Sequence, residues 1–294
     1  MYNPLVLSPS DQSQRAPQSF PRVASPEAPI GLFDSGVGGL TVLRALEARL
    51  PHEHTVYLGD TARVPYGTRS GEVVTRYALL NARHLAAQGI KALVVACNTV
   101  SAYSLPQLQA ALPIPVLGVI EPGAQAAAAR THGQAIAVLG TPGTINSGAY
   151  QAALRRLAPM APVIARACPL FVALAEEGWT EGEVPRLVAE RYLGDLRRAG
   201  VGTVLLGCTH YPLLARTVAE VVGPKVVVVD GAEATAAAAE QLLSARGLLR
   251  SPGGRVTRRT ICTDLPERFA QLAARFLGRP VEDVEQVDLV EGRG

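Results

Sequence analysis

The chain has 294 residues, of which 48% are hydrophobic, 18% are charged and 5% are aromatic, and its formal net charge is +3. This length fits one large or two medium domains with a substantial hydrophobic core, so a globular protein is expected. The small charge and the scarcity of aromatic residues give no sign of a nucleic-acid-binding surface, and the apolar runs are far shorter than the ~20 residues that span a membrane.

Cysteine and lysine usage excludes several further classes. Four cysteines are too few and too scattered for a disulfide scaffold: Cys97, Cys168, Cys208 and Cys262. The start of the chain lacks the charged and apolar regions of a secretory signal, so we expect a reducing cytoplasm. No CxxC or HxxxH spacing occurs, and both lysines, Lys91 and Lys225, stand just before apolar runs. We therefore expect no metal and no cofactor, including pyridoxal phosphate on a lysine.

The first part of the chain has no regular period. Residues 1–28 are rich in Pro, Ser, Gln and Ala, which predicts a disordered or loosely packed arm. Residues 29–33 then predict a strand, residues 34–39 (DSGVGG) a glycine-rich turn, and residues 40–46 a helix. Such a turn can direct backbone N–H groups towards an anion, but it lacks GxGxxG spacing, so a ligand loop and a merely tight turn stay equally open. Asp34 favours a ligand site, because an acid there can hold an ammonium group or tune a neighbouring acid or base.

The next segments continue the alternation of strand and helix. A strand is predicted at 55–58, and it runs into the long polar loop 59–67, a kind of loop that often carries function. Taken alone, Tyr66 and Gly67 fit an ordinary turn as well as a binding loop. A helix is predicted over residues 71–88. Alternating strands and helices are typical of parallel sheets covered by helices.

Two short stretches read as copies of one another. Residues 92–99 (ALVVACNT) and 203–210 (TVLLGCTH) each place a cysteine and small polar residues after an apolar run of strand length. The carboxyl ends of parallel strands are where α/β sheets bind ligands, so we expect Cys97 and Cys208 to enter one crevice. Two structural core cysteines are the alternative, which the polar residues after each cysteine disfavour. The third cysteine, Cys168, lacks a polar motif and is expected to be a small buried hydrophobe.

The pattern of strand and glycine turn restarts at residues 135–144, which predicts two similar halves. The expected fold class is α/β, with two pseudo-symmetric parallel-sheet domains facing each other across a central cleft. We expect a first domain of residues 29–123 plus 232–294 and a second domain of residues 124–231. The last segments complete the first sheet as strand, helix and strand: 256–263, 265–277 and 281–289.

Four blocks, in this order, resemble the cofactor-independent glutamate racemases of the aspartate/glutamate racemase superfamily: 34–41 (DSGVGGLT), 59–67 (GDTARVPYG), 96–99 (ACNT) and 207–212 (GCTHYP). The resemblance covers residue 29 to the C-terminus and is silent on the arm. It implies the pseudo-symmetric two-domain fold and the interconversion of L- and D-glutamate for bacterial peptidoglycan.

The same resemblance implies roles for individual residues. Cys97 and Cys208 would be the two acid/base thiols, and the substrate would be held by Asp34, Ser35, Tyr66, Gly67, Asn98, Thr99, Thr209 and His210. Asp34, His210 and Glu176 would assist catalysis. Glu176 lies where the family has an acid beside the second thiol. Ala173 departs from the proline common there and Glu177 is adjacent, so both glutamates remain candidates.

The chemistry of racemisation explains why two thiols are needed. A base must remove the Cα proton and an acid must return one to the opposite face, and two cysteines can exchange these roles. Without an imine or a metal, hydrogen bonds, fixed dipoles and a dry cleft must stabilise the carbanion. We expect glutamate as the substrate, a homodimer, and no nucleic-acid or membrane partner. A racemase for aspartate or another amino acid, or a binding module without catalysis, stays open; a nucleotide-dependent oxidoreductase is disfavoured.

Overall fold

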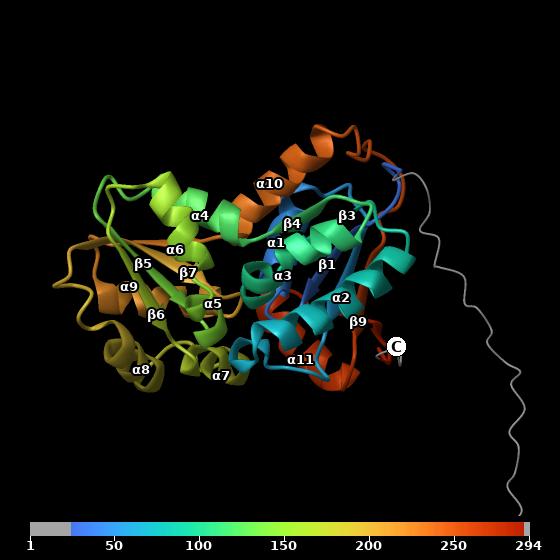
Figure 1. Ribbon diagram of the computed structural model, residues 1–294. Coiled ribbons are helices and arrows are strands. Elements are labelled where there is room, and N and C mark those ends of the chain that lie inside the picture. The colour runs from blue at the N-terminus through green and yellow to red at the C-terminus, as the bar shows by residue number, and fades with distance from the viewer. Residues whose placement is uncertain (1–24, 291–294) are drawn as a thin grey trace, which may run out of the picture.

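The computed structural model describes residues 25–290, whose strands form two separate sheets (Figure 1). The first sheet has the order β10-β9-β2-β1-β3-β4, with β1 (Ile30–Asp34), β2 (Thr55–Gly59), β3 (Ala92–Val95), β4 (Val116–Gly118), β9 (Arg258–Cys262) and β10 (Val284–Gln286). The second has the order β6-β5-β7-β8, with β5 (Ala135–Gly140), β6 (Val163–Ala167), β7 (Val201–Gly207) and β8 (Val227–Asp230). All pairings in these sheets are parallel, which confirms the predicted α/β fold class.

Helices cover both faces of each sheet. The first sheet packs against α1 (Leu40–Arg49), α2 (Gly71–Ala87), α3 (Asn98–Ala111), α10 (Ala232–Ser244) and α11 (Pro266–Leu277). The second packs against α4 (Ile120–Ala128), α5 (Pro142–Asn146), α6 (Ala149–Leu157), α7 (Leu170–Glu177), α8 (Glu183–Leu193) and α9 (Ala215–Val222). Two short 3-10 helices complete the structure: η1 (Tyr66–Thr68) and η2 (Tyr211–Leu214).

Strand residues alternate between the two faces of the first sheet. On β1, Leu32 joins the core beneath α1, α10 and α11, whereas Phe33 joins the core beneath α2 and α3. Both positions are fully buried, as expected for a parallel sheet covered on both faces. The core beneath α1 continues into the second domain through Leu206 and Phe171, so one apolar cluster joins the two domains.

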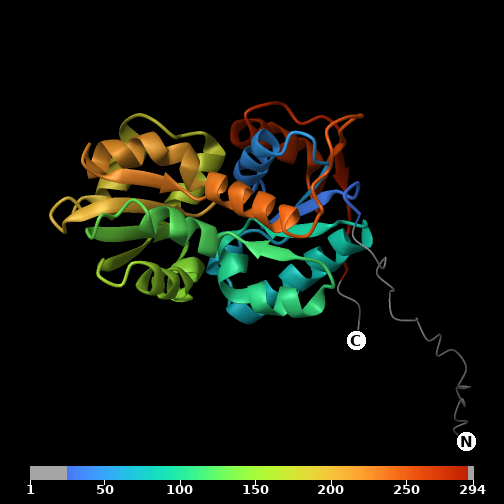
Figure 2. The same ribbon diagram turned by 90° about the horizontal axis from the view of Figure 1, so that it is seen from above.

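The two sheets share a common pattern. The order β2-β1-β3-β4 of the first is repeated as β6-β5-β7-β8 in the second, and a cysteine follows both β3 and β7. The two additional strands, β9 and β10, extend the first sheet only. In Figure 2 the two domains lie side by side, and α10 (orange) runs from the second back along the first. The domain limits expected from the sequence stay a prediction.

Some segments differ from the sequence-based expectation. Strand β6 was not anticipated. It is a half-buried edge strand. It lacks a continuous apolar run because it contains Arg166, which donates a hydrogen bond to the exposed Asp195. Residues 281–289 form only the three-residue strand β10.

Only the end of the predicted arm belongs to the described residues. Residues 25–28 form a turn, and the Pro26 carbonyl accepts a hydrogen bond of 2.6 Å from Lys91 Nζ. Lys91 also pairs with Glu53 in the buried interior, at the end of β3 opposite the cysteine. Residues 1–24 lie outside the described residues. Within residues 25–290, no helix has the length and apolar character needed to cross a membrane.

Candidate active site

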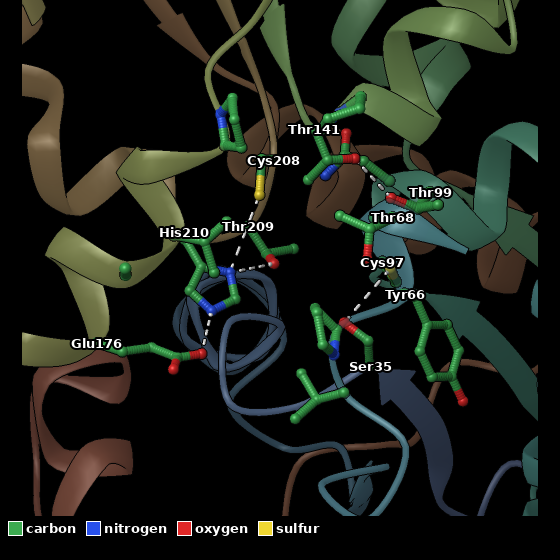
Figure 3. A pocket seen from close by; sticks show the side chains of 18 residues that line it. Ser35, Tyr66, Thr68, Cys97, Thr99, Thr141, Glu176, Cys208, Thr209 and His210 are labelled. Atoms are coloured by element: carbon green, nitrogen blue, oxygen red, sulfur yellow. Dashed lines mark hydrogen bonds and ion pairs between the residues drawn. The ribbon is translucent and has the colours of Figure 1, made fainter. Parts of the chain in front are cut away.

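A cavity of about 310 Å³ lies where the carboxyl ends of strands from both sheets meet (Figure 3). Residues directly after β1, β3, β5 and β7 contribute to its wall. Every predicted site residue except Asp34 lines it: Ser35, Tyr66, Gly67, Cys97, Asn98, Thr99, Glu176, Cys208, Thr209 and His210. The cavity is therefore the crevice that the paired strands predicted.

Cys97 enters the cavity from the first domain. It lies between β3 and the first turn of α3, is 5% exposed, and its Sγ is 3.8 Å from Ser35 Oγ. Burial and the nearby Asp34 carboxylate raise the pKa of the Cys97 thiol to about 12. The raised pKa favours the protonated form of the Cys97 thiol at neutral pH.

Cys208 enters from the second domain, directly after β7, and is 7% exposed. Its Sγ lies 3.9 Å from His210 Nδ1, and His210 Nε2 lies 3.0 Å from Glu176 Oε1. Burial alone would lower the pKa of His210, but hydrogen bonds to Cys208 and Glu176 raise this pKa to about 10. The hydrogen bond from His210 lowers the pKa of Glu176. The raised pKa favours an imidazolium at His210, held by the Glu176 carboxylate, and a positive charge beside a thiol stabilises its thiolate form.

The structure separates the two adjacent glutamates at the end of α7. Glu176 lines the cavity and bonds His210, as Figure 3 shows. Glu177 is exposed. Since only Glu176 turns towards the thiols, it is the better candidate for the assisting acid.

Asp34 lies behind the cavity wall. It is fully buried, and it accepts hydrogen bonds from Gly36 N at 3.0 Å and from Thr209 Oγ1 at 3.4 Å. Burial raises the pKa of the Asp34 carboxyl, an effect that the charge of His210 opposes. Its contacts are thus with its own glycine-rich turn and with the loop that carries Cys208, whereas the resemblance also implied a role in holding the substrate.

Tyr66 lines the cavity with its ring. Its hydroxyl donates to the buried Asp60 carboxylate and also accepts from Asn81 Nδ2 at 3.1 Å. Asp60 further accepts from Arg63 and from Thr263, each at 2.8 Å. The Tyr66 hydroxyl is therefore engaged in hydrogen bonds within the protein, and the Tyr66 ring shapes the cavity wall.

The first turn of α3 is suited to an anion. Asn98 and Thr99 begin this 14-residue helix, whose amino end carries partial positive charge. Asn98 Oδ1 accepts a hydrogen bond of 2.6 Å from Tyr150 in the second domain, which leaves the Asn98 amide N–H groups to donate. Thr99, Thr141 and Thr144 form a hydroxyl cluster with O···O distances of 2.9–3.0 Å.

Several wall residues were not found by sequence reasoning. These include Val64, Thr68, Thr141, Pro142, Pro169, Val172 and Ala173. A signal for Thr141 existed in the internal repeat, because the offset that relates Ile30 to Ile136 also relates Ser35 to Thr141. The apolar residues carry no comparable signal, since valine and proline occur throughout the chain.

Gly38 allows the two domains to approach. A Cβ at this position would lie 2.3 Å from Thr209 Oγ1 and 2.5 Å from His210 Nδ1. Both distances are far below van der Waals contact. The glycine-rich turn therefore makes room for the loop that follows Cys208.

These features define a pseudo-symmetric, two-domain α/β protein with one thiol from each domain in a shared cavity. The chain belongs to the Asp/Glu/Hydantoin racemase family, whose model matches residues 39–239. The glutamate racemase of Geobacter metallireducens is 54% identical over 260 residues, which cover 88% of this chain and 96% of the relative.

Solved structures give the same result. The glutamate racemase of Francisella tularensis in complex with D-glutamate is 35% identical, with a TM-score of 0.84 over 90% of this chain and 98% of that one. The glutamate racemase of Thermus thermophilus in complex with beta-chloro-D-alanine is 46% identical, with a TM-score of 0.82 over the same shares of the two chains.

Proposed function

We propose that this chain is a cofactor-independent glutamate racemase that interconverts L- and D-glutamate by two proton transfers at Cα, one at each of two thiols. The observation that carries the proposal is the shared cavity, which Cys97 and Cys208 enter from equivalent strands of opposite domains. The resemblance to glutamate racemases over most of the chain supports glutamate as the substrate.

Two protons are transferred, in two coupled steps. With Cα between the two sulfurs, the Cys208 thiolate takes the Cα proton of one enantiomer, and the bonding electron pair stays on Cα. The Cys97 thiol then gives its proton to the opposite face. The product is the other enantiomer, with Cys208 protonated and Cys97 ionised, and the reverse reaction starts from this state. The unlike neighbours of the two thiols, Ser35 at Cys97 and His210 at Cys208, support different roles for them in one direction of the reaction.

The substrate carboxylates need fixed donors. The N–H groups at the start of α3, the amide of Asn98 and the hydroxyls of Thr99 and Thr141 are suitably placed in the wall. The same donors stabilise the negative charge that develops when Cα loses its proton, because they are already oriented in the cavity wall.

The test measures hydrogen exchange at Cα as well as racemisation. The wild type should racemise glutamate much faster than aspartate in a circular dichroism assay, and it should wash deuterium from solvent into Cα. Cys97→Ala and Cys208→Ala should each reduce racemisation of both enantiomers to near zero. Near-normal turnover in either variant contradicts the two-thiol scheme, and a wild type that binds glutamate without exchange is a binding module. Preferential turnover of aspartate contradicts the substrate assignment.

The cellular setting follows from the chemistry. The product D-glutamate supplies peptidoglycan synthesis, and a cytoplasmic location suits the four free cysteines. We further propose a homodimer, for which light scattering of the purified protein is the test. A monomeric mass over the working concentration range would contradict it.

A further inference from the structure

Thr41 joins the two domains directly behind the active site. It lies in the first turn of α1 and is 2% exposed. Its Oγ1 is 3.2 Å from the carbonyl oxygen of Thr209 in the second domain and 3.0 Å from the carbonyl oxygen of Gly38 in its own. It is not part of the wall of the main cavity. It borders a much smaller void behind Cys208 and Asn98.

The first domain thereby fixes Thr209 at two points. Asp34 accepts a hydrogen bond from the Thr209 hydroxyl, and Thr41 donates one to the Thr209 carbonyl. Thr209 stands between Cys208 and His210, so both of these side chains depend on where its backbone lies. Because the Thr209 residue is 6% exposed, water is poorly placed to replace a lost donor.

The hydroxyl of Thr41 has one hydrogen and faces two carbonyl oxygens. This hydrogen can be shared between them. The Thr209 carbonyl accepts it from the opposite domain, whereas the Gly38 carbonyl accepts it within the domain of Thr41 itself.

We infer that Thr41 is a positioning residue for proton transfer, whose hydroxyl holds the loop 208–210 in its place relative to Asp34 and Cys97. This inference rests on the proposed racemase activity. Thr41 does not touch the substrate cavity, so it acts on the chemical step through Cys208 and His210. Misplacing a reacting group by a fraction of an ångström slows a reaction severely, even when binding is retained.

The test compares Thr41→Val, which keeps the shape and removes the hydroxyl, with Thr41→Ser, which keeps the hydroxyl. In Thr41→Val we expect kcat to fall about tenfold in both directions while the KM for each enantiomer changes less than about twofold. The isotope effect of Cα deuteration on kcat should rise, because proton transfer becomes more rate-limiting. Thr41→Ser should return both quantities towards the wild type.

Thr217→Val is the matched control. Thr217 is also 2% exposed and donates to a carbonyl of a distant segment, that of Thr180 at 2.7 Å, but both residues lie in the second domain away from the cavity. Thr217→Val should lower the free energy of unfolding without raising the isotope effect. If Thr41→Val fails to fold, Thr41→Ala is the second donor-free variant, and the same kinetics are expected of it.

The outcomes separate the inference from the function on which it rests. An active wild type with unchanged kcat and isotope effect in Thr41→Val overturns the inference alone. Equal losses in Thr41→Val and Thr41→Ser also overturn it, because the hydroxyl would then be irrelevant. A wild type that neither racemises glutamate nor exchanges its Cα proton overturns the proposed function, and the inference falls with it.

Discussion

Glu176 Oε1 lies 3.0 Å from His210 Nε2, and this acid–imidazole pair stands beside only one of the two thiols. The other thiol, Cys97, has a serine hydroxyl as its neighbour. Two domains with the same strand order therefore present two thiols in different electrostatic surroundings. This difference allows one sulfur to be ionised while the other still carries its proton.

Replacing Glu176 by Gln tests the charge on His210. The Glu176 carboxylate accepts a hydrogen bond from His210 and helps to raise the pKa of His210 to about 10, so removing the carboxylate charge should lower this pKa. If the imidazolium is the active form, activity is lost as pH rises through the His210 pKa, and the variant should lose activity at lower pH than the wild type. We expect kcat to fall at least about tenfold near pH 8. The measurement is the pH dependence of kcat, and Glu177→Gln is the control. An alkaline limb at the same pH in all three proteins would show that Glu176 does not set the charge of His210.

Gly38→Ala should disrupt the contact between the domains. The added Cβ would meet Thr209 Oγ1 and His210 Nδ1 at 2.3 and 2.5 Å, so the loop after Cys208 has to move. We expect activity to fall about a hundredfold or more, with far-ultraviolet circular dichroism unchanged. Gly36→Ala in the same turn is the control, because its nearest side-chain atom, on Val64, is 3.6 Å away. Comparable loss in both variants would mean that the turn, and not the domain contact, requires glycine.

Asp34→Asn should separate stability from activity. Burial raises the pKa of Asp34 above its ordinary value of 3.8, so its contribution to stability is present at low pH and is lost as pH rises through the folded-state pKa. The variant has no such loss. Its melting temperature relative to the wild type should therefore increase from about pH 4 to pH 8, while racemisation falls. A difference in melting temperature that shrinks over this range contradicts the assignment of a raised pKa.

Tyr66→Phe should weaken the loop 59–67 without removing a substrate contact. The Tyr66 hydroxyl donates a hydrogen bond to the buried Asp60, so Asp60 would lose one of its donors. We expect a loss of about 1–3 kcal/mol in the free energy of unfolding, measured with urea, and a larger change in KM than in kcat. Tyr103→Phe in α3, outside the cavity wall, is the control. A selective fall in kcat with unchanged stability would instead assign the hydroxyl a part in the reaction.

The sequence alone determined the fold class and pointed to Cys97 and Cys208 as the candidate pair of thiols. Strands such as β3 and β7 are continuous apolar runs that end abruptly in a cysteine, and a parallel sheet places such ends at one edge. These features are local, because they depend on residues within a few positions of each other. The half-buried edge strand β6 lacked such a run and was not recognised.

The tertiary structure decided what each polar group touches. It placed Asp34 behind Thr209, turned the Tyr66 hydroxyl to Asp60, and selected Glu176 over Glu177. It also brought Thr41 to the carbonyl of Thr209, 168 positions along the chain. The contacts of Asp34 and Thr41 with Thr209 depend on how the two sheets close on each other, and no pattern of neighbouring residues encodes their distances. A sequence thus specifies which groups are available for chemistry, while the packing of the two domains sets their distances and their charges.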